Sequence, residues 1–222
     1  LVLIDEAHDN FHTLAGRYKP FADLLTNDGY RVAPNKKKFS REALEGIAVL
    51  VVANAAGAPG NPDCEQPVLA AEEMDAVAEW VKTGGSLLLV ADHAPYGSCA
   101  APLAERFGVN MNKGNTADPF HHDPDTGNAS FLVFSRENGL LGDHPIVNGR
   151  DASERVKVVM SFTGQSLKGP EGSVSLLKLS DTAFDRPVRT AAERQAAREQ
   201  AKASGGIGIR KEQLNLSDLP SA

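Results

Sequence analysis

Acidic and histidine side chains follow two short apolar stretches of the chain. The first stretch, 1–4, runs into Asp5-Glu6-Ala-His8, and the second, 86–91, runs into Asp92-His93. Each stretch has the length of a buried strand, and in an open parallel sheet ligands bind beyond the carboxyl ends of the strands. We therefore expect Glu6, His8, Asp92 and His93 to face one crevice as the catalytic residues.

These residue types suit acid–base or metal chemistry. A carboxylate beside an imidazole orients the ring and raises its basicity, which suits a general base or a metal ligand. In this interpretation His93, oriented by Asp92, activates water directly or helps to hold a zinc or calcium ion that does so. Glu6 then acts as the partner acid or base, and His8 binds the metal or stabilises a developing oxyanion. The competing interpretation is that Asp5 and Asp92 cap the following turns, with the histidines packed or exposed.

Other imidazoles and one serine extend the list of candidates. The segment His121-His122-Asp123-Pro-Asp125 combines zinc-type and calcium-type ligands, although its order departs from that of an EF-hand. Its two histidines and two aspartates are predicted metal ligands together with His8 and His93, and the rival interpretation is a flexible polar loop without a metal. His12, and His144 within Asp143-His144-Pro145, are further candidates for the same edge.

Ser166 lies in Gly164-Gln-Ser166, which resembles a nucleophile elbow only superficially because the second glycine is not at the required spacing. No phosphate-cradling glycine loop follows a predicted strand, which argues against a nucleotide cofactor.

The elements that must position these residues alternate along the first 110 residues. Apolar runs predict strands, and apolar residues at helical spacing predict helices between them; the strands are expected at 1–5, 30–33, 47–53 and 86–91, and the helices at 17–28, 40–45, 72–82 and 100–107. Such alternation with short connections predicts a parallel sheet with right-handed crossovers.

The sequence after residue 110 is less regular. A polar loop is expected at about 110–130, strands at 131–134, 156–162 and 174–179, and a charged surface helix at 189–204 within an insertion at about 181–210. We predict one α/β domain over 1–222, a three-layer sandwich with a mainly parallel, flavodoxin-like sheet. The segment after Leu214 contains no evident strand or helix to close such a domain.

One stretch carries a family resemblance. Ala78-Glu-Trp-Val-Lys-Thr-Gly-Gly-Ser-Leu-Leu-Leu-Val-Ala-Asp-His93 resembles the class I glutamine amidotransferase-like superfamily, where a helix, a glycine pair and a strand lead into a tight turn that bears the site residue. The opening Leu3–His12 is similar to an uncharacterised bacterial branch, and we extend the resemblance over about 1–180. Amidotransferases carry a cysteine at the turn, whereas His93 or Asp92 stands there in this chain, as in the trehalose-utilisation-like branch. Cys99 comes six residues too late, so the resemblance implies a fold and a site location but not glutaminase chemistry.

Composition excludes several classes of partner. The 222 residues are 41% hydrophobic and 23% charged, and the formal net charge of −6 disfavours a nucleic-acid partner, which needs a basic face. The one basic run, Lys36-Lys37-Lys38, lies beside Pro34-Asn35 and is expected in a solvated loop. No apolar stretch approaches the ~18 residues that a membrane span requires.

Two cysteines bear on the cellular compartment. Cys64 and Cys99 lie in segments that follow neighbouring predicted strands at one edge of the sheet, so they are either two unrelated thiols or a disulfide formed in an oxidising compartment. The chain begins at Leu1 directly on a predicted strand, and we expect that a signal peptide or a tag preceded it. The expected location is periplasmic or secreted, with the cytoplasm as the alternative.

Together these patterns predict a hydrolase of a small neutral ester or lactone. The alternatives are a carbohydrate-active hydrolase, or a non-catalytic domain that uses the crevice only for ligand binding or interaction. The sequence does not indicate an oligomeric state.

Overall fold

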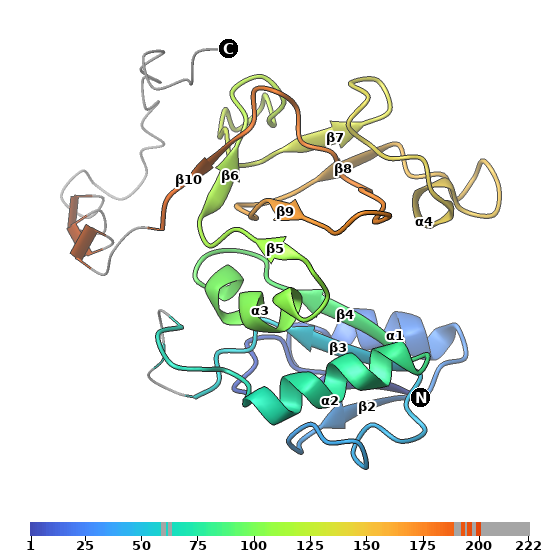
Figure 1. The fold of residues 1–222 in the computed structure, drawn as a ribbon. Coiled ribbons are helices and arrows are strands. Elements are labelled where there is room, and N and C mark those ends of the chain that lie inside the picture. The colour runs from blue at the N-terminus through green and yellow to red at the C-terminus, as the bar shows by residue number, and fades with distance from the viewer. Residues whose placement is uncertain (59–60, 62–63, 189–191, 194, 197–198, 201–222) are drawn as a thin grey trace.

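A four-stranded, all-parallel sheet forms the first half of the protein in the computed structural model (Figure 1), which describes residues 1–222 except 59–60, 62–63, 189–191, 194, 197–198 and 201–222. The strands are β1 (Val2–Asp5), β2 (Val32–Asn35), β3 (Val49–Ala53) and β4 (Ser86–Val90). They lie in the order β2-β1-β3-β4, so β1 has a neighbour on each edge and β4 is an edge strand. The predicted α/β organisation with parallel strands is confirmed.

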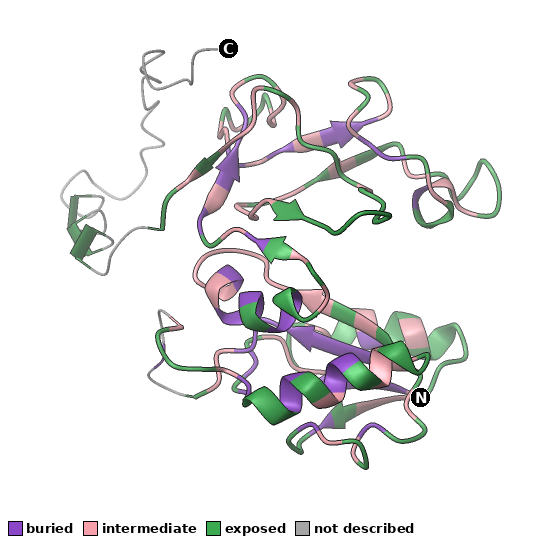
Figure 2. Cartoon of the chain, in the orientation of Figure 1, coloured by how far each residue is buried: buried purple, intermediate pink, exposed green. Residues whose placement is uncertain are grey.

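Successive side chains of a strand point to opposite faces of the sheet, so apolar residues lie on both faces. Helices cover each of these faces. On one face Val2, Ile4 and Val51 pack with Ala22 of α1 (Lys19–Asn27). On the other face Leu3, Leu50 and Val52 pack with Met74 and Val77 of α2 (Ala71–Lys82) and with Leu103 of α3 (Tyr96–Glu105). Figure 2 shows the buried residues concentrated in the central strands and on the inner faces of α2 and α3.

Strand β4 is covered less completely than its neighbours. Leu87 and Leu89 join the core on the side of α2, whereas the side chain of Leu88, on the opposite face, is 43% exposed. Gly84 and Gly85 lie in the short connection between α2 and β4. A Cβ atom at Gly85 would lie 2.2 Å from the ring of Trp80, so this close approach requires glycine.

The second half contains three short antiparallel strand pairs connected by longer loops (Figure 1). The pairs are β5 (Asn110–Met111) with β9 (Leu167–Lys168), β6 (Asn115–Ala117) with β10 (Phe184–Arg186), and β7 (Val133–Ser135) with β8 (Val158–Met160); helix α4 (Pro145–Asn148) precedes β8.

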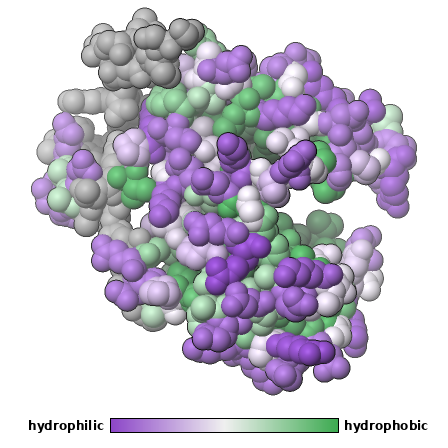
Figure 3. Space-filling model, in the orientation of Figure 1, coloured by the Kyte–Doolittle hydropathy of each residue, from purple (hydrophilic) through white to green (hydrophobic). Residues whose placement is uncertain are grey.

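These pairs correct the predicted secondary structure of this half. The predicted loop at 110–130 contains β5 and β6, and the predicted strand at 174–179 forms only an isolated bridge between Leu177 and Leu141. The predicted helix at 189–204 lies largely outside the described residues, as does the segment after Leu214. Every helix in the described part of the chain is too short or too polar to cross a bilayer. In Figure 3 hydrophilic side chains cover most of the visible face, and hydrophobic ones are seen where the antiparallel pairs meet the parallel half.

Candidate functional site

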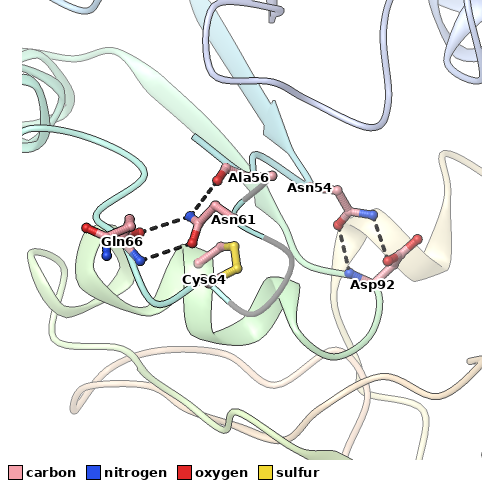
Figure 4. Close-up of a disulfide and its surroundings, with 7 residues drawn as sticks. Asn54, Ala56, Asn61, Cys64, Gln66 and Asp92 are labelled. Atoms are coloured by element: carbon pink, nitrogen blue, oxygen red, sulfur yellow. Dashed lines mark hydrogen bonds between the residues drawn. A yellow bond between two sulfur atoms is a disulfide. The ribbon is translucent and has the colours of Figure 1, made fainter. Parts of the chain in front are cut away.

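Asp92 occupies the carboxyl edge of the sheet and is held there by Asn54. Asn54 is the first residue after β3, and Asp92 is the second residue after β4. The Asn54 side-chain amide donates to Asp92 Oδ1 at 2.7 Å, and the Asp92 main-chain N–H donates to Asn54 Oδ1 at 3.1 Å (Figure 4). Asn54 is buried at φ +46°, a left-handed conformation that asparagine tolerates better than most residues. This reciprocal pair fixes the position of the Asp92 carboxylate.

Two imidazoles lie beside this carboxylate. His93 Nδ1 is hydrogen-bonded to Asp92 Oδ1, and His12 Nε2 lies 3.8 Å from Asp92 Oδ2. Burial lowers the pKa of His12. The charge of Asp92 acts in the opposite direction, but the charges of Arg17 and His93 lower the pKa further. His12 is therefore neutral at pH 7, and its Nδ1 is buried with no hydrogen-bond partner among the described residues.

Aromatic rings surround the two imidazoles. The His12 ring lies 4.7 Å from that of Tyr18, and His93 meets Tyr96 edge-on at 5.2 Å. Phe11 contacts His12 at 5.2 Å and is itself covered by the guanidinium of Arg17 at 4.5 Å. Burial, followed by the charge of Asp92, raises the pKa of Tyr18 and of Tyr96, so both hydroxyls keep their protons.

His8, by contrast, is part of the core. It is 3% exposed, with Nδ1 at 2.8 Å from Asp5 Oδ2 and Nε2 at 3.0 Å from Glu73 Oε1. Both ring nitrogens are engaged, so the proposed roles of His8 as a metal ligand or oxyanion stabiliser do not fit its environment. It connects the end of β1 to the first turn of α2.

The carboxylates around His8 have further partners. Glu73 accepts hydrogen bonds from the main-chain N–H groups of Phe39 and Ala70, at 2.9 and 3.1 Å, and Asn35 donates to Asp5 at 3.1 Å. Burial alone would lower the pKa of His8, but its hydrogen bonds to Asp5 and Glu73 and the charges of those carboxylates outweigh burial and raise it. Below pH 6.5 the ring is therefore a buried imidazolium between two acidic side chains, and it stabilises the junction of β1 and α2.

Glu6 also has a local structural role. Its Oε1 accepts a hydrogen bond from the Leu14 main chain at 2.8 Å, and this bond closes the loop that follows β1. Asp5 Oδ1 accepts from Ala7 N at 3.3 Å, as the capping interpretation expects. Of the four predicted catalytic residues, only Asp92 and His93 are joined by a contact.

The predicted metal ligands at 121–125 have protein partners instead. His121 Nδ1 lies 3.0 Å from Asp118 Oδ2, His122 Nδ1 lies 3.0 Å from the Asp118 carbonyl, and the Asp123 carboxylate accepts from Thr126 N at 3.1 Å. Asp125 has no such partner among the described residues. Among all the residues that the structure describes, no three histidine, cysteine or acidic side chains come close enough together to hold a metal ion.

Asp118 is a residue that the sequence reasoning missed. It is buried and accepts hydrogen bonds from the hydroxyls of Ser180 and Thr182 and from the Phe120 main chain, as well as the contact with His121. Although burial raises its pKa, these hydrogen bonds outweigh burial and lower it. No local pattern marks this aspartate, because its hydroxyl partners are more than 60 residues away along the chain.

The remaining candidates are engaged in turns and strand contacts. His144 Nδ1 accepts from Ile146 N at 3.2 Å and caps the short helix α4. Ser166 donates to Asp185 Oδ2 at 2.7 Å and precedes the short strand β9. Ser166 is therefore not presented on a strand-to-helix elbow.

A disulfide joins Cys64 to Cys99, and their Cα atoms are 5.1 Å apart. Of the two alternatives for these cysteines, the structure shows the disulfide. The bond links the segment after β3, which begins with Asn54, to helix α3, which follows the segment that contains Asp92 (Figure 4).

A cleft of about 520 Å³ lies beside Asp92, His93 and the carboxyl end of β4. Its lining comes from the end of β4 and the residues after it, from Met111 of β5, and from residues between 161 and 167; the principal apolar members are Leu89, Val90, Met111, Phe162 and Leu167. The site thus consists of a polar crevice at the strand ends that continues into an apolar groove.

Comparison with known proteins gives a structural likeness only. No family model matches the chain, and no curated protein matches it in sequence. Among solved structures it is similar to one described as mmIFT52 N-terminal domain, with a TM-score of 0.61, 14% identity, and coverage of 84% of this chain and 77% of that one. This likeness shows the fold. At such low identity it does not transfer a function.

The prediction of an ester or lactone hydrolase is wrong. The likeness is to a structure described as mmIFT52 N-terminal domain, which gives no support to a hydrolase. In addition, His8 and Glu6 are used within the fold, which leaves the Asp92–His93 pair without the acid–base partners that the predicted mechanism required.

Proposed function

We propose that this chain is a non-catalytic binding domain that recognises a small polar molecule in the crevice around Asp92. The observation that carries the proposal is the buried His12 Nδ1, which has no partner among the described residues although it lies on the ring beside Asp92. Buried polar atoms are nearly always hydrogen-bonded, and leaving one without a partner costs about 1–3 kcal/mol. A bound ligand is the natural source of the missing bond.

The surrounding groups define the chemistry of that ligand. Asp92 Oδ2 accepts a hydrogen bond, the protonated hydroxyls of Tyr18 and Tyr96 donate, and Phe11 offers an apolar face. The ligand therefore combines hydroxyl or amine donors with a small apolar surface. The likeness to a domain of mmIFT52 supports a binding role over a catalytic one.

The same proposal includes the finer fold and the compartment. The strand order β2-β1-β3-β4 with helices on both faces supports a flavodoxin-like, three-layer arrangement. The position of His93 between β4 and α3 supports a place near the amidotransferase-like superfamily. The Cys64–Cys99 disulfide supports a periplasmic or secreted location.

Ligand-observed NMR with a library of small polar fragments tests the binding role. Fragments should bind the wild-type chain, and Asp92→Asn should weaken them about tenfold because it removes a charged acceptor. Asp125→Asn is the matched control, since the exposed Asp125 side chain has no hydrogen-bond partner among the described residues and its change should leave binding unchanged. The absence of fragment binding, or turnover of an ester that Asp92→Asn abolishes, would contradict the proposal.

A further inference from the structure

The outer edge of β4 exposes main-chain groups that have no partner in the described part of the chain. Ser86 N donates to Ala48 O and Val90 O accepts from Asn54 N, both at 3.0 Å, so these residues face β3. Main-chain groups of successive strand residues point to opposite edges. The N–H and C=O groups of Leu87 and Leu89 therefore point outward, where β4 has no neighbouring strand.

This edge lacks two of the features that protect most edge strands. Natural sheets block their edges with charges, prolines, bulges or a covering element. Residues 86–90 read Ser-Leu-Leu-Leu-Val, with no charge and no proline, and Leu88 is 43% exposed on one face. An unprotected apolar edge is a template for another strand.

The apolar groove adjoins the carboxyl end of the same edge, at Leu89 and Val90. Its far wall is formed by Phe162 and Leu167, which are 55% and 60% exposed, and its near wall by Leu89 and Val90 of β4. Side chains of an added strand that point into this groove would cover these residues. The groove thus supplies side-chain contacts beside the main-chain groups.

Gln165 already makes one contact of the kind that an added strand would make. Its amide Nε2 donates to the carbonyl of Ala91, the next outward-facing residue after Leu89. Its Oε1 is buried without a partner among the described residues, which leaves an acceptor at the end of the groove for an incoming N–H group.

We propose that an extended segment of a partner protein adds to β4 as a fifth strand, with apolar side chains at alternate positions lying against Phe162 and Leu167. A basic residue at the end near Asp92 would complement its charge. The exposed edge is five residues, about 17 Å, long, and a strip of that length is small beside the roughly 1,600 Å² that a stable interface between folded proteins buries. The edge therefore fits a single peptide segment better than a second copy of the chain.

This inference goes beyond the proposed function because its determinants are main-chain atoms of β4 and not the side chains of the crevice. The probe is a displayed library of random twelve-residue peptides selected on the whole, disulfide-bonded chain. Selected peptides should carry apolar residues at every second position. Failure to select any peptide above background would overturn the proposal.

Backbone N-methylation of a selected peptide tests strand addition on the unaltered protein. Methylation at alternate residues should weaken binding at least tenfold, because it removes the N–H groups that pair with β4. Methylation at the intervening residues should leave the affinity within about twofold. Equal sensitivity at all positions, or none, would show that the peptide does not bind as a strand.

Variants of the protein provide the complementary test. Leu89→Pro removes the outward N–H, a change that edge strands tolerate, and it should weaken the peptide at least tenfold more than Leu89→Ala. His12→Gln should weaken fragment binding in the crevice and leave peptide affinity unchanged, which separates the two proposals. A dimer in light scattering that Leu89→Pro abolishes would assign the edge to a second copy and overturn the inference.

Discussion

Removal of His8 should be one of the most destabilising single changes in the protein. His8→Ala leaves Asp5, which is fully buried, and Glu73, which is 5% exposed, without the cation that both contact. Loss of one partner from a buried ionic group costs about 3–5 kcal/mol. A domain of this kind is stable by about 5–15 kcal/mol, so the expected loss is at least about a fifth of the total.

Urea unfolding followed by the fluorescence of Trp80 measures this loss. Trp80 is the single tryptophan of the chain and lies on α2, the helix that also carries Glu73. At an m-value of about 2 kcal/mol/M, the midpoint should fall by about 2 M. The measurement belongs at a pH between 4.5 and 6.5, where His8 is protonated and Glu73 is ionised.

His121→Ala is the matched control for this experiment. His121 also contacts a buried aspartate, but its side chain is 31% exposed and Asp118 keeps its other hydrogen-bond donors. Its removal should cost no more than about 1.5 kcal/mol. If His8→Ala lost less than about 1 kcal/mol, or no more than the control, the buried imidazolium would not be the stabilising group argued for here.

Three further predictions follow from the described contacts. In an NMR titration the His8 ring should lose its proton above pH 6.5 and the His12 ring below pH 6.5, and coincident titrations would contradict this. Because the pKa of His8 is raised in the folded state, the stabilising contribution of His8 should be complete below pH 6.5. It should decline as the pH rises through that raised pKa. Asp118→Ala should destabilise the protein by at least about 2 kcal/mol, since several partly buried donors lose their acceptor, and a urea midpoint equal to that of the wild type would count against this role. Reduction of Cys64–Cys99, which are 35 residues apart, should cost about 4 kcal/mol, measured as the difference in midpoint with and without reductant; equal midpoints would exclude a stabilising crosslink.

The parallel half of the fold was predictable because its signals are local. Apolar runs that end at Asp5 and Asp92, and helical apolar spacing before Gly29 and Gly84, identify strands and helices from short windows of sequence. The antiparallel pairs of the second half are two or three residues long, so their stability comes from distant partners, as in β6 with β10. Windows of sequence carry little information about such pairs.

The sequence predicted where the site lies but not which residues form it. Asp92 and His93 lie at the strand edge as expected, and His12, which was a lesser candidate, lies beside them. His8 could not be separated from this group by sequence, because its second carboxylate, Glu73, is 65 residues away. A histidine and an acid at a strand end predict either a site or a buried ion pair, and only the distant partner distinguishes the two.

The central place of β1 has a mechanical consequence. β1 pairs in parallel with β2 on one edge and with β3 on the other, whereas β4 pairs with β3 alone. A pull along β1 from its first residue therefore loads two ladders of hydrogen bonds in shear at once. A pull on β4 across the sheet would open a single ladder bond by bond, so the protein should resist tension well along its first strand and poorly at its outer one.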